Sequence, residues 1–305
     1  MAENNKPSQL LLWLKVMRFF SLSFTGIVGL IGAGFAFMSP GRVNWCLMPV
    51  VLAGAFFLHL GANLASEYFD YKKGVDRTGS LGGTGLLVQG YLSPIKVYRA
   101  GIGFFIAGVV AGAYVVYRVD WIVLLFGCGG VICGYFYGGR PVSFKYRGLG
   151  DVMIFLCFGP LMMLGTYYAL VQSFSWKAAA ASVPMGMLIT AVVVANNIRD
   201  ISSDVEADIT TLASSLGFRA ARFEYIFLVA GAYVFTVIMV IFGYFPLSTL
   251  AVLLAVAAAG KNIKTMWNAE KIDSPQLAAM DKKTAPLVAQ FGLLFFASVM
   301  LNALI

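Results

Sequence analysis

The chain has 305 residues, of which 60% are hydrophobic and only 12% are charged. Soluble globular domains carry about twice that share of charged residues, so this composition excludes an ordinary soluble protein. Lysines and arginines outnumber acidic residues by 22 to 14, which gives a net charge of +8.

Long apolar segments predict an integral membrane protein. A helix needs about 20 mostly apolar residues to cross the hydrocarbon core of a bilayer. Windows of that length predict nine membrane-spanning helices, at residues 18–38, 43–66, 97–117, 120–138, 151–171, 178–198, 221–243, 246–260 and 284–304. The expected fold is therefore all-α, with nine transmembrane helices in a single domain that covers residues 1–305.

Basic residues predict the orientation of these helices. Nineteen of the 22 lysines and arginines fall on one side of the predicted spans, and the other side holds only Arg42, Arg118 and Lys177. Because basic residues near helix ends stay in the cytoplasm, the N-terminus is expected there and the chain in the inner (cytoplasmic) membrane. This topology explains the net charge, and no nucleic-acid partner is expected.

Polar residues gather at the end of the second predicted span. Asn63, Glu67 and Asp70 are four and three residues apart, so a helix places them on one face. Gly74 is expected to end this helix just before Asp76. The second span is therefore predicted to end in a cluster of oxygen ligands.

A glycine-rich loop follows this helix end, with glycines at positions 79, 82, 83, 85 and 90. Three basic residues precede it: Lys72, Lys73 and Arg77. Two interpretations stay open. The loop is either a plain connector or a lid whose backbone N–H groups contact a phosphate.

Aromatic and basic residues follow one another at the end of the fourth predicted span, among them Tyr135, Lys145 and Arg147. Aromatic residues near a membrane surface usually form an interfacial belt. Because basic residues accompany them here, a second interpretation is that the group holds an aromatic, anionic molecule.

A second polar stretch continues from the sixth predicted span. Its members recur every four residues, close to one helical turn, and are Asn196, Asp200, Asp204 and Asp208. If the helix continues through this stretch, all four side chains lie on one stripe. Three carboxylates on one face repel one another, and a divalent cation would neutralise them.

The two polar stretches are alike, and their asparagines, Asn63 and Asn196, are 133 residues apart. This offset suggests a duplicated unit and two halves, roughly 10–171 and 172–305. Both stretches lie on the predicted cytoplasmic side, where they would form facing carboxylate clusters. Mg²⁺ is normally held by a few carboxylates and by phosphate oxygens of a substrate, so a diphosphate-bearing substrate is expected. Interhelical ion pairs are the structural alternative.

These motifs resemble a known family. Residues 63–76 and 196–217 are similar to the two aspartate motifs of the UbiA superfamily of membrane prenyltransferases. Two features most resemble its MenA branch, the dihydroxynaphthoate polyprenyltransferases. One is the segment Asn-Leu-Ala-x-x-Tyr-x-Asp-x-x-Lys-Gly-x-Asp, and the other is the Arg-Pro and Gly-Leu-Gly-Asp after the fourth span.

The resemblance implies a UbiA-type helical bundle with a cytoplasmic-side cap and an Mg²⁺-dependent enzyme. Such an enzyme transfers a polyprenyl group from polyprenyl diphosphate to an aromatic acid. In the MenA branch the acceptor is dihydroxynaphthoate, whose carboxylate leaves as carbon dioxide to give demethylmenaquinone. The polyprenyl tail would lie in an apolar channel open to membrane lipid.

The resemblance also implies roles for individual residues. One Mg²⁺ would be held by Asn63, Glu67 and Asp70, and a second by Asn196, Asp200 and Asp204. The expected catalytic residues are Asp70, Asp200, Asp204 and Tyr135. The expected substrate-binding residues are Arg18, Lys72, Lys73, Arg77, Arg199, Lys145 and Arg147. Outer acids would be Asp76 and Asp208.

The chain departs from the family pattern at three places. Glu67 stands where the branch commonly has aspartate, which still supplies carboxylate oxygens. Phe19 replaces a proline that follows the arginine in the first helix. The pair Asp208-Ile209 replaces a Gly-Lys before Thr-Leu, so a lysine that could touch phosphate is missing.

Two rival functions stay open at this point. Another aromatic prenyltransferase of the same superfamily would take hydroxybenzoate or homogentisate as acceptor. A cation-coupled membrane transporter also places acids inside helices, typically near the bilayer midplane. In this sequence the acids cluster at one membrane face, beside basic residues.

Overall fold

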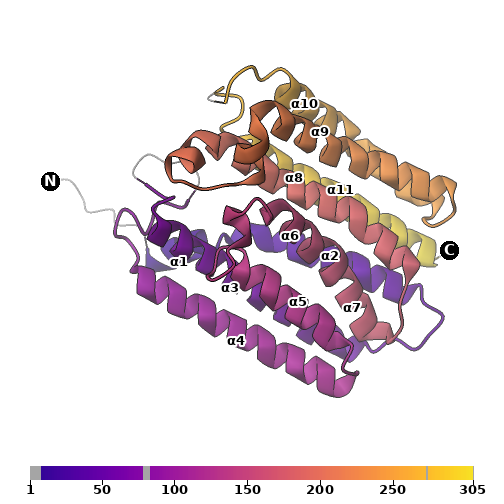
Figure 1. Cartoon of the computed structure of the whole chain (residues 1–305). Helices are drawn as coiled ribbons and strands as arrows, with labels where there is room; N and C mark the ends of the chain where they lie inside the picture. The colour runs from indigo at the N-terminus through magenta and orange to yellow at the C-terminus, as the bar shows by residue number, and fades with distance from the viewer. Residues whose placement is uncertain (1–7, 78–82, 273, 305) are drawn as a thin grey trace.

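The computed structural model describes residues 8–77, 83–272 and 274–304 as helices joined by turns (Figure 1). The principal helices are α1 Gln9–Val16, α2 Leu22–Phe37, α3 Met48–Lys73, α4 Pro94–Arg118, α5 Val123–Phe136, α6 Gly150–Leu156, α7 Met162–Val171, α8 Trp176–Glu206, α9 Leu212–Ile241, α10 Val256–Trp267 and α11 Met280–Leu304. Shorter helical segments are η1 Phe19–Ser21, η2 Trp45–Leu47, η3 Phe144–Tyr146, η4 Cys157–Leu161 and η5 Leu247–Ala255. Within the described ranges the one β-type contact is an isolated bridge between Arg147 and Thr210, so the all-α prediction is confirmed.

Eight helical segments are long and apolar enough to cross a membrane, so this is a multi-pass membrane protein. They run Phe19–Phe37, Trp45–Lys73, Pro94–Arg118, Gly150–Val171, Trp176–Glu206, Leu212–Ile241, Leu247–Trp267 and Met280–Leu304. The fourth predicted span coincides with α5, which is apolar but has only 14 residues. A helix of that length rises about 21 Å, which is shorter than the roughly 30 Å hydrocarbon core.

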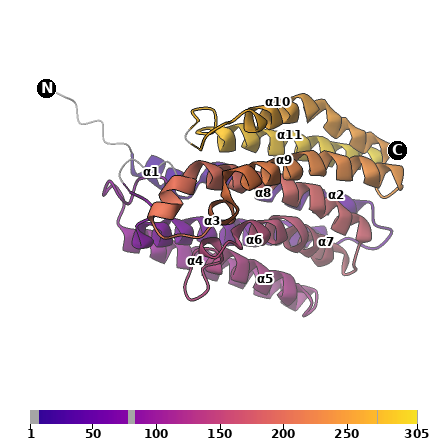
Figure 2. The ribbon, with the colours of Figure 1, turned by 45° about the horizontal axis from the view of Figure 1, so that its top comes forward.

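Helix α8 forms the centre of the bundle. It is the most buried of the eight candidate spans and packs against α2, α9 and α11 (Figures 1 and 2). The main apolar core lies between these helices and includes Met185, Tyr225 and Phe291. Because Asn196, Asp200 and Asp204 lie in the last turns of α8, they are attached to the most buried of the candidate spans.

Helix α3, which carries the first polar stretch, is held closely by α4. A methyl group on Gly61 would come within 2.9 Å of the Phe105 ring, and one on Gly101 would lie 3.3 Å from the backbone nitrogen of Ala65. These two glycines therefore allow the helices to approach closely, as small residues do between membrane helices.

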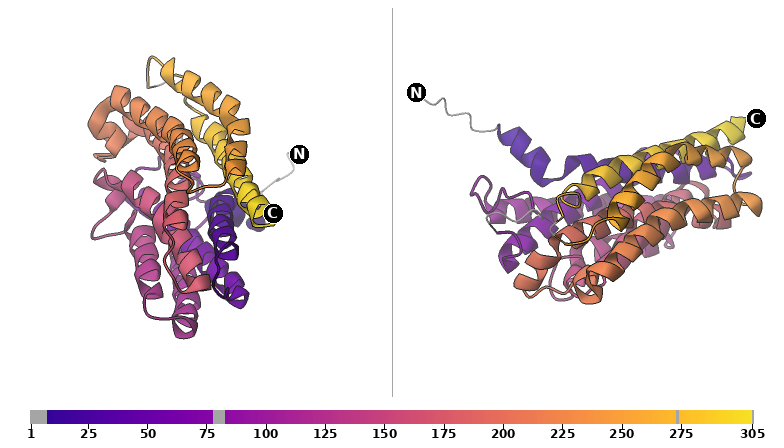
Figure 3. Two further views of the ribbon diagram at one scale, coloured as in Figure 1. Left: turned by 90° about the vertical axis from the view of Figure 1, so that its right-hand side faces the viewer. Right: turned by 90° about the horizontal axis from the view of Figure 1, so that it is seen from above.

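The ends of α3 and α8 lie at the same end of the bundle, near α1 and far from the last residues of α11 (Figure 3). Arg77, just after α3, donates from Nη2 to the backbone oxygen of Glu206, the last residue of α8, over 3.1 Å. Its Nη1 also lies 3.6 Å from Glu206 Oε2. These contacts bring the two polar stretches together. Their placement at one end of the bundle agrees with the prediction that both lie on the same side of the membrane.

Candidate active site

The first polar stretch forms the last turns of α3, and Gly74 ends the helix as predicted. Gly74 has φ +72°, a left-handed conformation that glycine adopts without strain. The carboxylates of Glu67 and Asp70 are deeply buried, with side chains only 1% and 3% exposed. Burial of two carboxylates is costly unless each is paired with a positive charge.

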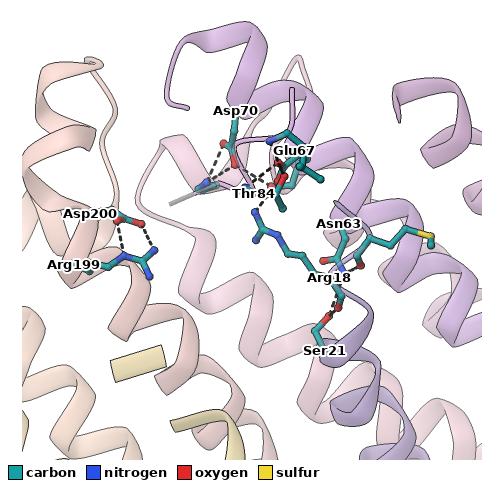
Figure 4. Close-up of polar contacts among 12 residues, drawn as sticks. Arg18, Ser21, Asn63, Glu67, Asp70, Thr84, Arg199 and Asp200 are labelled. Atoms are coloured by element: carbon teal, nitrogen blue, oxygen red, sulfur yellow. Dashed lines mark hydrogen bonds and ion pairs between the residues drawn. The ribbon is translucent and has the colours of Figure 1, made fainter. Parts of the chain in front are cut away.

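Arg18 neutralises Glu67, with its Nη2 atom 3.1 Å from Glu67 Oε2 (Figure 4). Burial alone would lower the pKa of Arg18, but the charges of Glu67, Asp70 and Asp76 outweigh it and raise that pKa. The guanidinium is therefore permanently charged. Arg18 itself sits at φ +50° in the turn between α1 and η1.

Asn63 holds this turn in place. Its Nδ2 atom donates to the backbone oxygen of Met17 over 2.9 Å and to Ser21 Oγ over 3.1 Å. An amide that donates from nitrogen presents its oxygen as the acceptor, so Oδ1 is the atom suited to a cation. Asn63 thus positions Arg18 from one side of its amide and offers an oxygen ligand from the other.

The described part of the glycine-rich loop folds back onto the first polar stretch. The Thr84 backbone N–H donates to Glu67 Oε1 over 3.0 Å, and the Thr84 hydroxyl donates to the same oxygen. Gly83 passes directly over the Asp76 carboxylate, and a Cβ at position 83 would overlap it. The contact with Glu67 favours a covering loop over a plain connector; positions 79 and 82 lie outside the described residues.

Substituting Gly83 by alanine is expected to lower kcat/KM by about 10- to 100-fold, because the loop must shift away from Asp76 and pull Thr84 off Glu67. Initial rates with varied concentrations of the prenyl diphosphate that the family resemblance implies would measure this. Gly103→Ala is the matched control, since a methyl group there meets open space. Equal activity of the two variants would show that the loop has no part in turnover.

Asp70 is enclosed by polar groups of the segment after α5. Lys145 Nζ lies 2.9 Å from both carboxylate oxygens, and the Tyr146 hydroxyl donates to Oδ1 over 2.6 Å. Burial alone would lower the pKa of Lys145, but Asp70 and Tyr137 raise it, so the ammonium stays charged. Lys145 was expected beside an aromatic acid, and the structure places it on a predicted metal ligand.

Asp76 completes the acidic group of the first polar stretch. Its carboxyl is buried, and this burial, reinforced by the charges of Asp70 and Glu67, raises its pKa to about 7. An acid with this pKa is partly protonated near neutral pH. Asp76 therefore contributes less negative charge than the sequence suggests.

The second polar stretch is divided by the end of α8. Asp200 accepts two bonds from its neighbour Arg199, at 2.8 and 2.7 Å (Figure 4). Arg199 also lies 3.4 Å from Asp281, at the start of α11. Asp204 is 4% exposed and accepts a bond of 3.3 Å from the Thr211 hydroxyl, which also caps α9. Asn196 is half-buried one turn before Asp200.

Asp208 does not share the stripe of the other acids, because α8 ends at Glu206. It is exposed and has φ +54°, the left-handed conformation that suits glycine, asparagine and aspartate best. This explains why aspartate can stand where the family pattern has glycine. The next residue, Ile209, is 4% exposed and points into the protein rather than toward a site.

The remaining predicted residues lie around this centre. Lys72 and Lys73 are exposed, with their ammonium groups 5.8 Å from the Tyr68 ring and 4.0 Å from the Tyr146 ring. Arg147 is exposed and reaches the Pro141 backbone oxygen at 3.5 Å. The Tyr135 hydroxyl lies 3.2 Å from that of Tyr98, within an aromatic cluster that includes Phe69 and Phe105.

Four contacting residues were not singled out from the sequence: Thr84, Tyr146, Thr211 and Asp281. Thr84 and Tyr146 belong to segments that the sequence did flag. Thr211 lies within the second motif, seven residues after Asp204, and carries an N-cap signal, which could have revealed it. Asp281 lies 82 residues from Arg199, and no local pattern predicts that pairing.

The donors at this centre suit a hard cation. Within the described ranges no three His, Cys, Asp or Glu side chains converge into a metal-binding group. Basic residues hold the acids instead: Arg18 on Glu67, Lys145 on Asp70 and Arg199 on Asp200. Carboxylate and amide oxygens are nevertheless the ligands that Mg²⁺ prefers, and Mg²⁺ needs few from the protein when a phosphate supplies others. The residues therefore fit an ion that arrives with a phosphate-bearing ligand.

Comparisons with known proteins identify the family of this chain. A model of the UbiA prenyltransferase family matches residues 27–281. The 1,4-dihydroxy-2-naphthoate octaprenyltransferase of Mycobacterium tuberculosis is 33% identical over 234 residues, which cover 75% of this chain and 78% of that protein. The protein of the same name from Bacillus subtilis is 26% identical over 261 residues, covering 86% and 83%.

A solved structure shares the fold. It is a UbiA homolog from Archaeoglobus fulgidus bound to GPP and Mg²⁺, with a TM-score of 0.61 and 18% sequence identity. The match covers 93% of this chain and 99% of that one. At this identity the likeness concerns the fold.

Proposed function

The chain belongs to the UbiA prenyltransferase family, and we propose that it transfers a polyprenyl group from polyprenyl diphosphate to dihydroxynaphthoate, with decarboxylation to the prenylated diol, which is the reduced form of demethylmenaquinone. Family membership makes the chain a prenyltransferase and removes the transporter alternative. The acceptor is inferred from the two naphthoate octaprenyltransferases to which the chain is similar. The observation that carries the proposal is the meeting of two buried acidic helix ends at one end of the bundle.

We propose two sets of Mg²⁺ ligands at these helix ends. Asn63, Glu67 and Asp70 form one set, and Asn196, Asp200 and Asp204 form the other. When bound, Mg²⁺ supplies positive charge that neutralises the diphosphate leaving group. Asp70, Asp200 and Asp204 would then contribute to catalysis as Mg²⁺ ligands. Through the bound Mg²⁺ they would orient the diphosphate so that its bond to the prenyl group can break.

The basic residues of the site divide into two groups in this proposal. Arg18, Lys145 and Arg199 keep the acids charged and oriented through the contacts described above. Lys72, Lys73 and Arg77 are exposed at the end of α3, where they would attract the polyanionic diphosphate. Tyr135 and Arg147 would lie on the side of the acceptor, with Asp76 and Asp208 as outer acids.

Two substitutions test this function. Asp70→Ala and Asp200→Ala are expected to abolish prenyl transfer while the protein still elutes as a folded species in detergent. Purified protein would be incubated with Mg²⁺, polyprenyl diphosphate and one acceptor at a time: dihydroxynaphthoate, hydroxybenzoate or homogentisate. Prenylation of either of the last two, without any of dihydroxynaphthoate, would replace the proposed acceptor and leave the reaction class standing.

Removing divalent cations with EDTA is expected to lower the rate by at least about 100-fold, because the leaving group loses its neutralising charge. The melting temperature should change little, since Glu67, Asp70 and Asp200 keep their basic partners. Added Mg²⁺ should restore the rate. A rate that is insensitive to EDTA would contradict the proposed ligand sets.

We also propose a topology of nine spans with the N-terminus and the site on the cytoplasmic side of the inner membrane. In this arrangement α5 is the fourth span, and the loop around Thr84 forms part of the cytoplasmic cap. The chain would be one domain of two motif-bearing halves, 10–171 and 172–305. The distribution of basic residues supports this orientation.

A further inference from the structure

A cavity of about 580 Å³ lies where α6 and α9 both pack against α8. It is lined mainly by apolar side chains, including Phe155, Met187 and Phe235. Its walls extend to residues that face the membrane: Val152, Phe227 and Val234 are 47%, 68% and 57% exposed. None of the acidic residues assigned to the Mg²⁺ sets lines it, so it is separate from the site described above.

Polar groups in this cavity have unused hydrogen-bonding capacity. Thr190 is 3% exposed, yet its hydroxyl has no hydrogen-bond partner among the described residues. The buried Oε2 atom of Glu224 also has none among them. Asp151 lines the cavity as well, and its Oδ1 accepts a bond of 3.0 Å from Asn197. Buried polar atoms without partners are uncommon and costly, so these groups point to a ligand that would satisfy them.

The charge of the cavity restricts what can bind. Among the residues that the structure describes, two carboxyl groups line it, and no lysine, arginine or histidine does. A diphosphate or a carboxylate would therefore find no positive partner there. A neutral molecule with hydroxyl groups can donate to Glu224 and Thr190, while an apolar body lies against the aromatic and aliphatic walls.

We propose that this cavity binds the neutral prenylated diol that the reaction produces. The inference rests on the proposed function. The prenyl donor loses its diphosphate and the aromatic acid loses its carboxylate as carbon dioxide, so both anions are absent from the product. Of the three reacting species, only the product then has the neutral charge, hydroxyl donors and apolar tail that the cavity accepts. The structure thus separates substrates and product by charge.

A matched pair of probes tests this assignment. The diol 2-geranyl-1,4-naphthalenediol, kept reduced with dithionite, donates two hydrogen bonds, whereas the corresponding 1,4-naphthoquinone has the same apolar body and donates none. Equilibrium binding to the purified protein in nanodiscs is expected to be about tenfold tighter for the diol. Equal affinities would overturn the proposal, and so would displacement of the diol by an equimolar amount of dioleoylglycerol.

Substitutions locate the binding. Thr190→Val and Glu224→Leu are each expected to weaken diol binding by about tenfold, and Glu224→Leu, which removes a carboxylate acceptor, should leave quinone binding unchanged. Thr236→Val is the control, because Thr236 is also fully buried in a span but bonds to the Ala232 backbone oxygen over 2.8 Å and does not line the cavity. Unchanged diol affinity in Thr190→Val would overturn the assignment.

Binding of the diol needs no turnover. The binding measurement therefore tests the cavity assignment, and the transfer assay tests the proposed function independently of it. Thr190→Val should melt no lower than the unmodified protein, because its hydroxyl makes no bond to lose. Inhibition of prenyl transfer by added diol should weaken by about tenfold in this variant. Diol binding in a protein without transferase activity would contradict the proposed function alone.

Discussion

Asp204→Asn is expected to lower kcat of prenyl transfer by about 100- to 1,000-fold. The carboxylate of Asp204 is 4% exposed at the end of α8, where we propose that it binds Mg²⁺. Asparagine has the same shape and keeps an oxygen to accept from Thr211, so the start of α9 should stay intact. The loss therefore reports the missing negative charge rather than a disturbed fold.

Asp208→Asn is the matched control. It makes the same chemical change four residues further on, and asparagine tolerates the positive φ of this position. Asp208 is exposed and lies beyond α8, so kcat should stay within about twofold of the unmodified enzyme. Initial rates at saturating substrates with fixed Mg²⁺ would compare the variants. Similar losses of kcat in Asp204→Asn and Asp208→Asn would contradict the conclusion that the end of α8 separates Asp208 from the other acids.

Lys145→Met is expected to destabilise the protein by about 3–5 kcal/mol, because it leaves the 3%-exposed Asp70 carboxylate without its cation. Methionine retains most of the apolar stem of lysine, so packing changes little. The double variant Lys145→Met with Asp70→Asn removes both charges and should recover most of that stability. Prenyl transfer should remain absent in the double variant, because the Asp70 carboxylate is gone.

Denaturant or thermal unfolding in a defined detergent would measure the stability of the two single variants and the double variant. A double variant that is less stable than either single one would show that the pair does not act as a unit. Transfer activity in the double variant would remove Asp70 from the proposed Mg²⁺ ligands. The two outcomes are separate, because one concerns folding and the other turnover.

Helix positions and end signals were predictable because they are local. The spacing of Asn63, Glu67 and Asp70 placed them on one face of α3, and Gly74 ended the helix as expected. In the same way, the spacing of Asn196, Asp200 and Asp204 predicted that they share one face of the helix that continues from the sixth predicted span, which is α8. Helical spacing and a glycine at a helix C-terminus depend only on residues that are close in the sequence, so they can be recognised without the tertiary structure.

The partners of the acids were not predictable in this way. Arg18 contacts Glu67 across 49 residues, and Lys145 contacts Asp70 across 75. The sequence suggested that both basic residues bind substrate. A basic residue that binds an anionic substrate and one that pairs with an acid inside the site look the same in the sequence. Which acid a lysine reaches depends on the packing of α3 against the segment after α5, and the sequence does not encode that locally.

The backbone at positions 208 and 209 also limits how this enzyme can change over evolutionary time. The positive φ at Asp208 favours glycine, asparagine and aspartate at that position, and the burial of Ile209 disfavours a lysine beside it. A single codon change that restored the family's Gly-Lys lysine would place a charge in the protein interior. Phosphate contacts in this chain would therefore have to come from basic residues on other segments, because a lysine at position 209 would need the backbone around it to change as well.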